Sequence, residues 1–181
     1  MASYPQKPTD QEQSGRKMGQ LMIYAMWIIV LLGLTYFFSS WLDHQRNPNQ
    51  TVAGSVDAAG NAEVVLERNR YGHYVATGKI NGNEVVFLLD TVATDVSIPA
   101  GLARQLGLRK GAAHNAITAN GIIEVYATSL ASVELGVIRL ENVRASINPG
   151  MDGQDILLGM SFLRQLDFSQ SGDRLTLKPQ R

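Results

Sequence analysis

An apolar run ends on an acidic residue in the stretch "VVFLLDTVATDVSIP", residues 85–99. A carboxylate at the end of a buried strand is costly to desolvate alone. It must be hydrated, hydrogen-bonded by its loop, or close to a second carboxylate that shares its proton. Such a carboxylate pair can activate water for hydrolysis, whereas a lone Asp more often simply begins a turn. The candidate catalytic residue is Asp90, and its loop continues through Thr91, Val92, Ala93 and Thr94.

The other residue types that could carry chemistry are less favourably arranged. His44, His73 and His114 show no metal-binding spacing. The sequence "GMSFL" around Ser161 departs from a nucleophile elbow at Leu163, and no histidine follows it. Cysteine is absent, and we find neither a phosphate-binding loop nor a dinucleotide fingerprint. We therefore predict no cofactor and no metal site.

Short strand-like runs separated by turns begin at about residue 62 and predict a mainly β domain of about 120 residues. "HYVATGKI" and "EVVFLLD" flank an Asn81-Gly82-Asn83 turn, and "PAGLARQL" predicts a short helix after the Asp90 loop. A second short helix is expected after Gly159. Further strands are expected at 112–118, 122–128, 130–135 and 137–147, with a hairpin tip at "TANG".

In this context, "FLLDTVAT" resembles the Asp-Thr-Gly-Ala-Thr signature of retropepsin-like aspartic proteases, especially compact bacterial members with a membrane anchor. The resemblance continues through "ITANG", the "NPGMDG" loop and "ILLGMSFL", and covers roughly residues 65–178. These motifs occur in the order that such a fold requires. Their joint match is more specific than any one of them.

The resemblance implies a closed retropepsin-like β-barrel with one or two short helices, acting on protein or peptide substrates. It implies that Asp90 is the catalytic aspartate and that Thr91 braces the loop through its hydroxyl. The flap tip would comprise Thr118, Ala119, Asn120 and Gly121. The strand behind the catalytic loop would comprise Ile156, Leu157, Leu158 and Gly159. Ile117, Ile122 and Ile123 fit either apolar substrate pockets or the β core, and we favour the core.

One chain carries one aspartate of this type. No other aspartate of the domain repeats the Asp-Thr pattern, and the domain is about half the length of a two-lobed enzyme of this class. A homodimer with its active site on the two-fold axis is the direct consequence.

Val92 stands where the family pattern has glycine. Valine is stiff, and it is an outlier at positive φ. Either the loop keeps an extended backbone or the carboxylates are misaligned. An active endopeptidase is therefore the first hypothesis, a pseudoprotease that binds peptides is the second, and a purely structural envelope domain is the third.

The N-terminal part carries a long apolar segment. No charged residue lies between Lys17 and Asp43. A helix over this uncharged segment would be long enough to cross a bilayer. A cleaved signal peptide is the main rival, but "FFSSWLDH" lacks a small-residue cleavage site. We predict a cytoplasmic tail over 1–17, a lipid-embedded signal anchor over 18–42, a flexible linker over 43–61 and the protease domain over 62–181.

Charge indicates the orientation and limits the partners. Lys7, Arg16 and Lys17 precede the apolar segment and only Arg46 closely follows it, which favours a cytoplasmic N-terminus and a periplasmic domain at a bacterial inner membrane. The 16 basic and 16 acidic residues balance, and no strongly basic tail is present. Nucleic acid is therefore not an expected partner.

Overall fold

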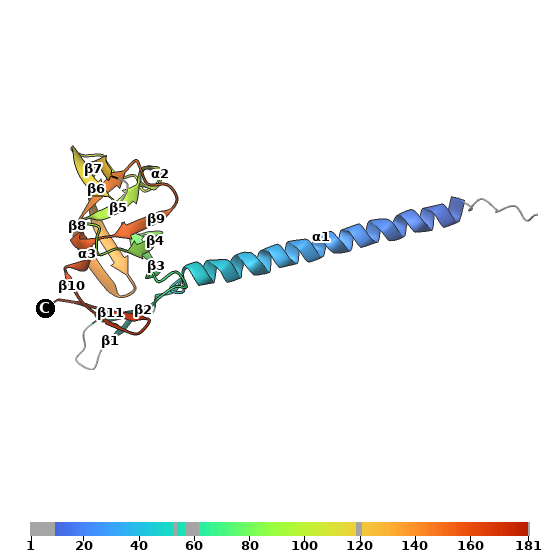
Figure 1. Ribbon diagram of the computed structural model, residues 1–181, viewed down its shortest axis with the longest axis horizontal. Helices are drawn as coiled ribbons and strands as arrows, with labels where there is room; N and C mark the ends of the chain where they lie inside the picture. Colours follow the sequence, from blue (N-terminus) through green and yellow to red (C-terminus); the bar gives the residue numbers. More distant parts are fainter. Residues whose placement is uncertain (1–9, 53, 57–61, 119–120, 181) are drawn as a thin grey trace, which may run out of the picture. The chain divides into compact units, whose positions relative to one another are not determined.

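The computed structural model describes residues 10–52, 54–56, 62–118 and 121–180, with side chains from residue 19 onward. It divides into a helical unit that ends at Asp43 and a compact unit that begins at His44. Figure 1 shows the order of the elements along the chain. Each unit is described by itself.

The helical unit consists of most of α1 (Asp10–Arg46). Residues 10–17, which belong to the predicted cytoplasmic tail, are helical, and residues 1–9 lie outside the described part. From Gly19 the helix contains a window of mean hydropathy 2.2, none of which is buried. A helix that is apolar on all sides and uncovered by protein is typical of a segment surrounded by lipid. Its length and composition are compatible with a single-pass membrane anchor.

The compact unit is mainly β, as predicted. Two short helices, α2 (Ala100–Gln105) and α3 (Met160–Leu163), lie within it. Its described strands are β1 (Gly54–Val56), β2 (Ala62–Glu67), β3 (Val75–Ile80), β4 (Asn83–Leu89), β5 (Val96–Pro99), β6 (Ala113–Thr118), β7 (Gly121–Leu135), β8 (Ile138–Asn148), β9 (Asp155–Leu158), β10 (Leu166–Ser171) and β11 (Arg174–Pro179).

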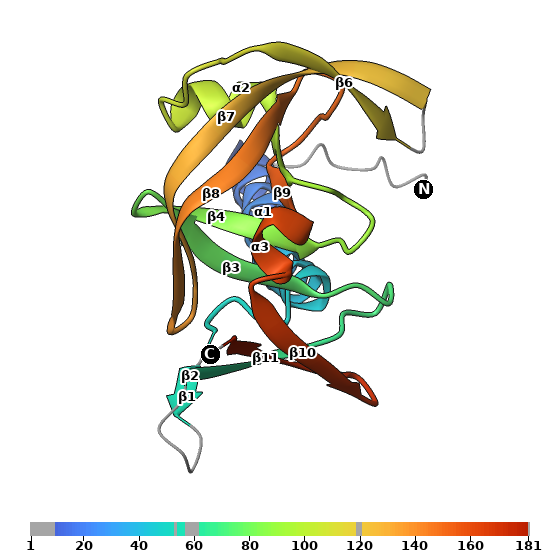
Figure 2. The same cartoon turned by 90° about the vertical axis from the view of Figure 1, so that its left-hand side faces the viewer.

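The larger sheet closes into a barrel, which confirms the predicted architecture. Its strand order is β3-β4-β9-β5-β8-β7-β6, and β3 also pairs with β7 through Lys79 opposite Glu134 and Ile80 opposite Val133. A smaller sheet has the order β1-β2-β11-β10. In Figures 1 and 2, the β6–β7 hairpin and the smaller sheet lie at opposite ends of the barrel.

Alternating side chains fill the core. In β4, Val85 and Phe87 are buried, and in β11 Leu175 and Leu177 are buried, as the period of a strand requires. The turn between β3 and β4 places Asn81 and Gly82 at φ +50° and +82°, the conformation that Asn-Gly favours in a two-residue hairpin.

Two expectations about elements differ from the structure. β7 is one continuous strand, where separate strands were expected at 122–128 and 130–135. The pairing between β7 and β8 is interrupted only at Ala131 and Asn142, where Asn142 has φ +54°. The pairing resumes at Ser132 and Glu141, so β7 does not end there. The second difference concerns the expected linker over 43–61.

The first part of that expected linker is packed into the domain. Asn47 and Asn49 are buried, and the Asn49 side chain donates to the carbonyls of Glu67 and Val75 and accepts from the Glu67 N–H. The Thr77 N–H also donates to the Asn49 carbonyl, at 3.0 Å. Composition alone suggested flexibility because the segment is small and polar. The Asn49 side chain instead hydrogen-bonds the backbone of β2 and β3, in the way that a neighbouring strand would.

Candidate active site

Asp90 lies directly after β4, at the start of the loop that leads to β5. β4 runs parallel to β9, and the Asp90 N–H donates to the Leu158 carbonyl at 3.2 Å. The Asp90 carboxylate accepts a hydrogen bond of 2.9 Å from the Val92 N–H. The residue is half-buried. One oxygen therefore shapes the turn while the side chain keeps access to solvent.

The loop is fixed from behind by the segment that follows β9. The Met160 N–H donates to the Ala93 carbonyl at 2.8 Å, and the Ser161 N–H donates to the Thr94 carbonyl at 2.9 Å. A Cβ on Gly159 would lie 2.3 Å from the Asp95 carbonyl oxygen and 2.6 Å from that of Ala93. Glycine is therefore required by close backbone approach.

Two side-chain contacts that the sequence analysis missed hold the far end of the loop. The buried Ser161 hydroxyl accepts from the Val96 N–H at 3.0 Å and donates to the Arg144 carbonyl at 2.7 Å. The Arg144 guanidinium forms an ion pair of 2.7 Å with Asp95. In the sequence, Ser161 follows Gly159 by two residues, which resembled only an incomplete nucleophile elbow. Its partners come from elements that are distant in the sequence.

Thr91 does not brace the loop within the single chain. Its side chain is exposed and forms no hydrogen bond with the residues that the structure describes. The bracing expected of Thr91 is supplied instead by Asp90 itself and by the backbone around Gly159.

Val92 does not adopt the positive φ that valine disfavours. In the described residues, positive φ outside glycine occurs only at Asn81 and Asn142, so the Val92 backbone avoids the left-handed region. The side chain is 90% exposed. Its methyl groups therefore project from the loop without a steric conflict inside the chain.

The expected flap is a β hairpin of β6 and β7. Thr118 pairs with Gly121 at its end, and the Thr118 hydroxyl donates to the Gly121 carbonyl at 2.9 Å. Ala119 and Asn120 lie outside the described residues. In Figure 2 the hairpin and the loop between β4 and β5 project on the same side of the barrel.

The three isoleucines near that hairpin end do not belong to the β core, so the prediction that they do was wrong. Ile117 and Ile122 are opposite one another and are 89% and 71% exposed, and Ile123 is half-buried. The residues expected to support the loop lie in and just after β9: Ile156 and Leu158 are fully buried, Leu157 lies between them, and Gly159 follows.

A closed barrel with an Asp-Thr loop held against a Leu-Gly segment defines an aspartic-protease-like domain. The family described as "gag-polyprotein putative aspartyl protease" matches residues 76–165. The crystal structure of a retropepsin-like aspartic protease from Rickettsia conorii superposes with a TM-score of 0.55 and 28% identity, covering 65% of this chain and 90% of that one. These two findings support a retropepsin-like aspartic protease family for this domain.

Two relatives extend the similarity toward the N-terminus. "Uncharacterized protein in cobV 5'region" from Sinorhizobium sp is 28% identical over 170 residues, which cover 87% of this chain and 73% of that protein. "Uncharacterized protein RP867" from Rickettsia prowazekii (strain Madrid E) is 26% identical over 149 residues, covering 78% of this chain and 63% of that protein.

Proposed function

We propose that this protein is a membrane-anchored aspartic endopeptidase that acts as a homodimer, with Asp90 of each chain in one catalytic pair. The observation that carries the proposal is the position of Asp90. It is half-buried at the end of a barrel strand, in a loop held by hydrogen bonds from both the Leu158 and Ser161 sides. A single loop of this kind supplies one carboxylate, and the chemistry requires two.

In the proposed reaction the two aspartates hold one water between them. One carboxylate takes a proton from the water, while the other, protonated, polarises the carbonyl of the peptide bond. The flap residues Thr118, Ala119, Asn120 and Gly121 would cover the substrate. The exposed Ile117 and Ile122 would offer apolar contacts to its side chains, since exposed apolar residues that gather at one place mark interaction sites.

A pseudoprotease remains the second candidate because of one observation. The Val92 side chain is 90% exposed only two residues after Asp90, so its methyl groups occupy space at the mouth of the proposed site. In the dimer that space would be needed by the partner loop or the substrate backbone. A displacement of about 1 Å there could reduce the rate on the order of a hundredfold.

One assay tests both candidates. The full chain in detergent should hydrolyse an unfolded protein substrate and be inhibited by a statine-type peptide. Asp90→Asn keeps an oxygen for the Val92 N–H but removes the acid, so the rate should fall on the order of a thousandfold or more. Asp152→Asn, a matched change at an exposed aspartate, should leave it unchanged.

Two outcomes would contradict the first candidate. Unchanged hydrolysis by Asp90→Asn would exclude the catalytic role. Activity that exists only in Val92→Gly would identify the present chain as a peptide-binding pseudoprotease.

We further propose that residues 18–42 anchor the protein in a bacterial inner membrane with the domain in the periplasm. The support is the uncovered apolar helix and the three basic residues before it. Because the chain has no cysteine, Ser171→Cys in β10 would be a unique reporter. A membrane-impermeant maleimide applied to spheroplasts should label it. Labelling only after the inner membrane is opened would reverse the orientation.

A further inference from the structure

A shallow groove crosses β7 away from the Asp90 loop. Its volume is about 390 Å³. In Figure 2 the turn between β3 and β4 and the segment after α2 lie on one side of the barrel, and the loop between β4 and β5 lies on the other. The groove is bounded by Asn81 on one side and residues 107–111 on the other, and its floor is formed by Ala127, Thr128, Ser129 and Ala131.

The floor of the groove is an open strand edge. Ala127 exchanges both backbone hydrogen bonds with the segment before β6, at 2.7 Å to the Gly111 N–H and 2.9 Å to the Ala112 carbonyl. Residues two apart in a strand face the same side, so Ser129 turns its N–H and C=O in the same direction. Among the described residues, the Ser129 N–H and C=O have no hydrogen-bond partner on this edge. The next hydrogen bonds along the edge join Ser132 to Asn81.

Unpaired positive charge flanks this edge. Arg104, Arg109 and Lys110 are exposed, and none of them forms an ion pair within the described part of the chain. No acidic residue occurs between Val96 and Ile123. By contrast, both arginines on the neighbouring strand β8 are paired, Arg139 with Glu134 and Arg144 with Asp95.

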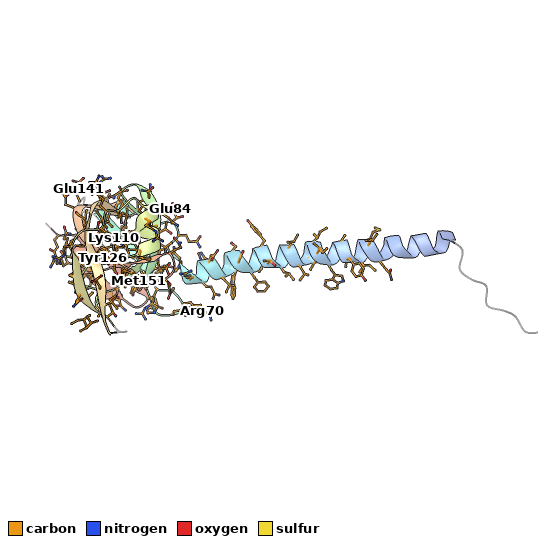
Figure 3. The ribbon with its side chains drawn as sticks, turned by 90° about the horizontal axis from the view of Figure 1, so that it is seen from above. Arg70, Glu84, Lys110, Tyr126, Glu141 and Met151 are labelled. Atoms are coloured by element: carbon orange, nitrogen blue, oxygen red, sulfur yellow. The ribbon has the colours of Figure 1, made fainter. Side chains whose placement is uncertain are left out.

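One of these cations is held in place. The Lys110 ammonium lies 4.5 Å from the centre of the Tyr126 ring, and Figure 3 shows the two residues side by side. The Tyr126 hydroxyl donates to the Glu124 carboxylate at 2.8 Å. This hydrogen bond, and next the negative charge of Glu124, raise the pKa of Tyr126. The hydrogen bond engages the edge of the ring, so the ring face remains available to the ammonium.

We propose that this groove is a second peptide-binding site, which takes an extended acidic segment of a protein. The segment would add to the β7 edge through the backbone of Ser129, as in β-strand addition, while its carboxylates pair with Arg109 and Lys110. The proposal goes beyond the proposed function, because neither Asp90 nor its loop takes part.

The open edge favours a peptide over other anions. An ionised phosphate group, free or in a lipid headgroup, would use the two cations and could accept from the Ser129 N–H, but it would leave the Ser129 C=O without a donor. An extended peptide satisfies both sets of groups. The small floor residues Ala127 and Ala131 allow its backbone to approach closely.

Fluorescence anisotropy on the full chain in detergent tests the site. The probe is a fluorescein-labelled pentapeptide of alternating glutamate and valine, compared with the same peptide carrying glutamine in place of glutamate. The acidic peptide should bind more tightly. The double variant Arg109→Gln/Lys110→Gln should weaken its binding about tenfold, because two exposed charge pairs are removed.

A matched control and a backbone variant separate the alternatives. Lys79→Gln/Arg164→Gln removes two exposed cations outside the groove that form no ion pair with any described residue, and it should leave the affinity unchanged. Ser129→Pro removes the edge N–H and should weaken both peptides, with folding checked by circular dichroism. An excess of a statine-type peptide should not displace the probe.

Several results would overturn the proposal: no measurable binding of the acidic peptide, equal binding of the neutral peptide, equal loss in the control variant, or displacement by the statine-type peptide. None of them depends on whether Asp90 is catalytic.

Discussion

The backbone around Gly159 and the Ser161 hydroxyl hold the Asp90 loop in place. Asp90 itself was identifiable because an acidic residue ends an apolar run and is followed by a recognisable motif. The bonds from Ser161 could not be predicted, because its partners Val96 and Arg144 are 65 and 17 residues away. The conformation of Val92 was also open, since one residue type permits several backbone regions.

Gly159 offers a test at this scale. A methyl group in Gly159→Ala would meet two carbonyl oxygens inside van der Waals distance, and the backbone on both sides is held by hydrogen bonds. The free energy of unfolding should fall by about 1–3 kcal/mol. Urea denaturation measures this change.

Gly101 is the matched control for that substitution. It lies in α2 and a Cβ there would meet nothing within 4 Å. Gly101→Ala should be neutral or slightly stabilising, because alanine favours helix over glycine. Equal stability of the two variants would show that the Asp90 loop is not packed against Gly159.

At the scale of elements, periodicity and turn chemistry predicted most strands and both short helices. They failed where long-range contacts override local composition. The segment from Asn47 to Asn49 reads as a linker, yet it is buried by side-chain bonds to the ends of β2 and β3. β7 reads as two strands, yet it continues because β8 pairs with it from Tyr126 to Leu135, across the point where a break was expected.

The role of the segment before β1 is tested by Asn49→Ala. The substitution removes three side-chain hydrogen bonds, and with them the partner of the buried Val75 carbonyl and of the part-buried Glu67 N–H and carbonyl. We expect a loss of about 1–3 kcal/mol in the free energy of unfolding. Faster limited proteolysis between His44 and Ala62 should accompany the loss.

Asn83→Ala is the control, since Asn83 is exposed and its side chain makes one long bond of 3.4 Å. A neutral effect at both asparagines would mean that residues 44–52 behave as the flexible linker originally expected.

At the scale of the whole molecule, we propose that an apolar helix anchors a domain that carries half of a catalytic site. Two chains held in one membrane meet at a raised effective concentration, which favours a dimer even when the domains alone associate weakly. Whether the exposed Val92 is accommodated across the two-fold axis is therefore a property of the assembly.

Activity in mixed dimers tests the central claim most directly. Wild-type and Asp90→Asn full chains are co-expressed in equal amounts with different tags, and hydrolysis is measured at constant total protein. If both aspartates form one site, a mixed dimer is inactive and about one quarter of the activity remains. About one half of the wild-type activity would show that each chain works alone and would contradict the shared catalytic pair.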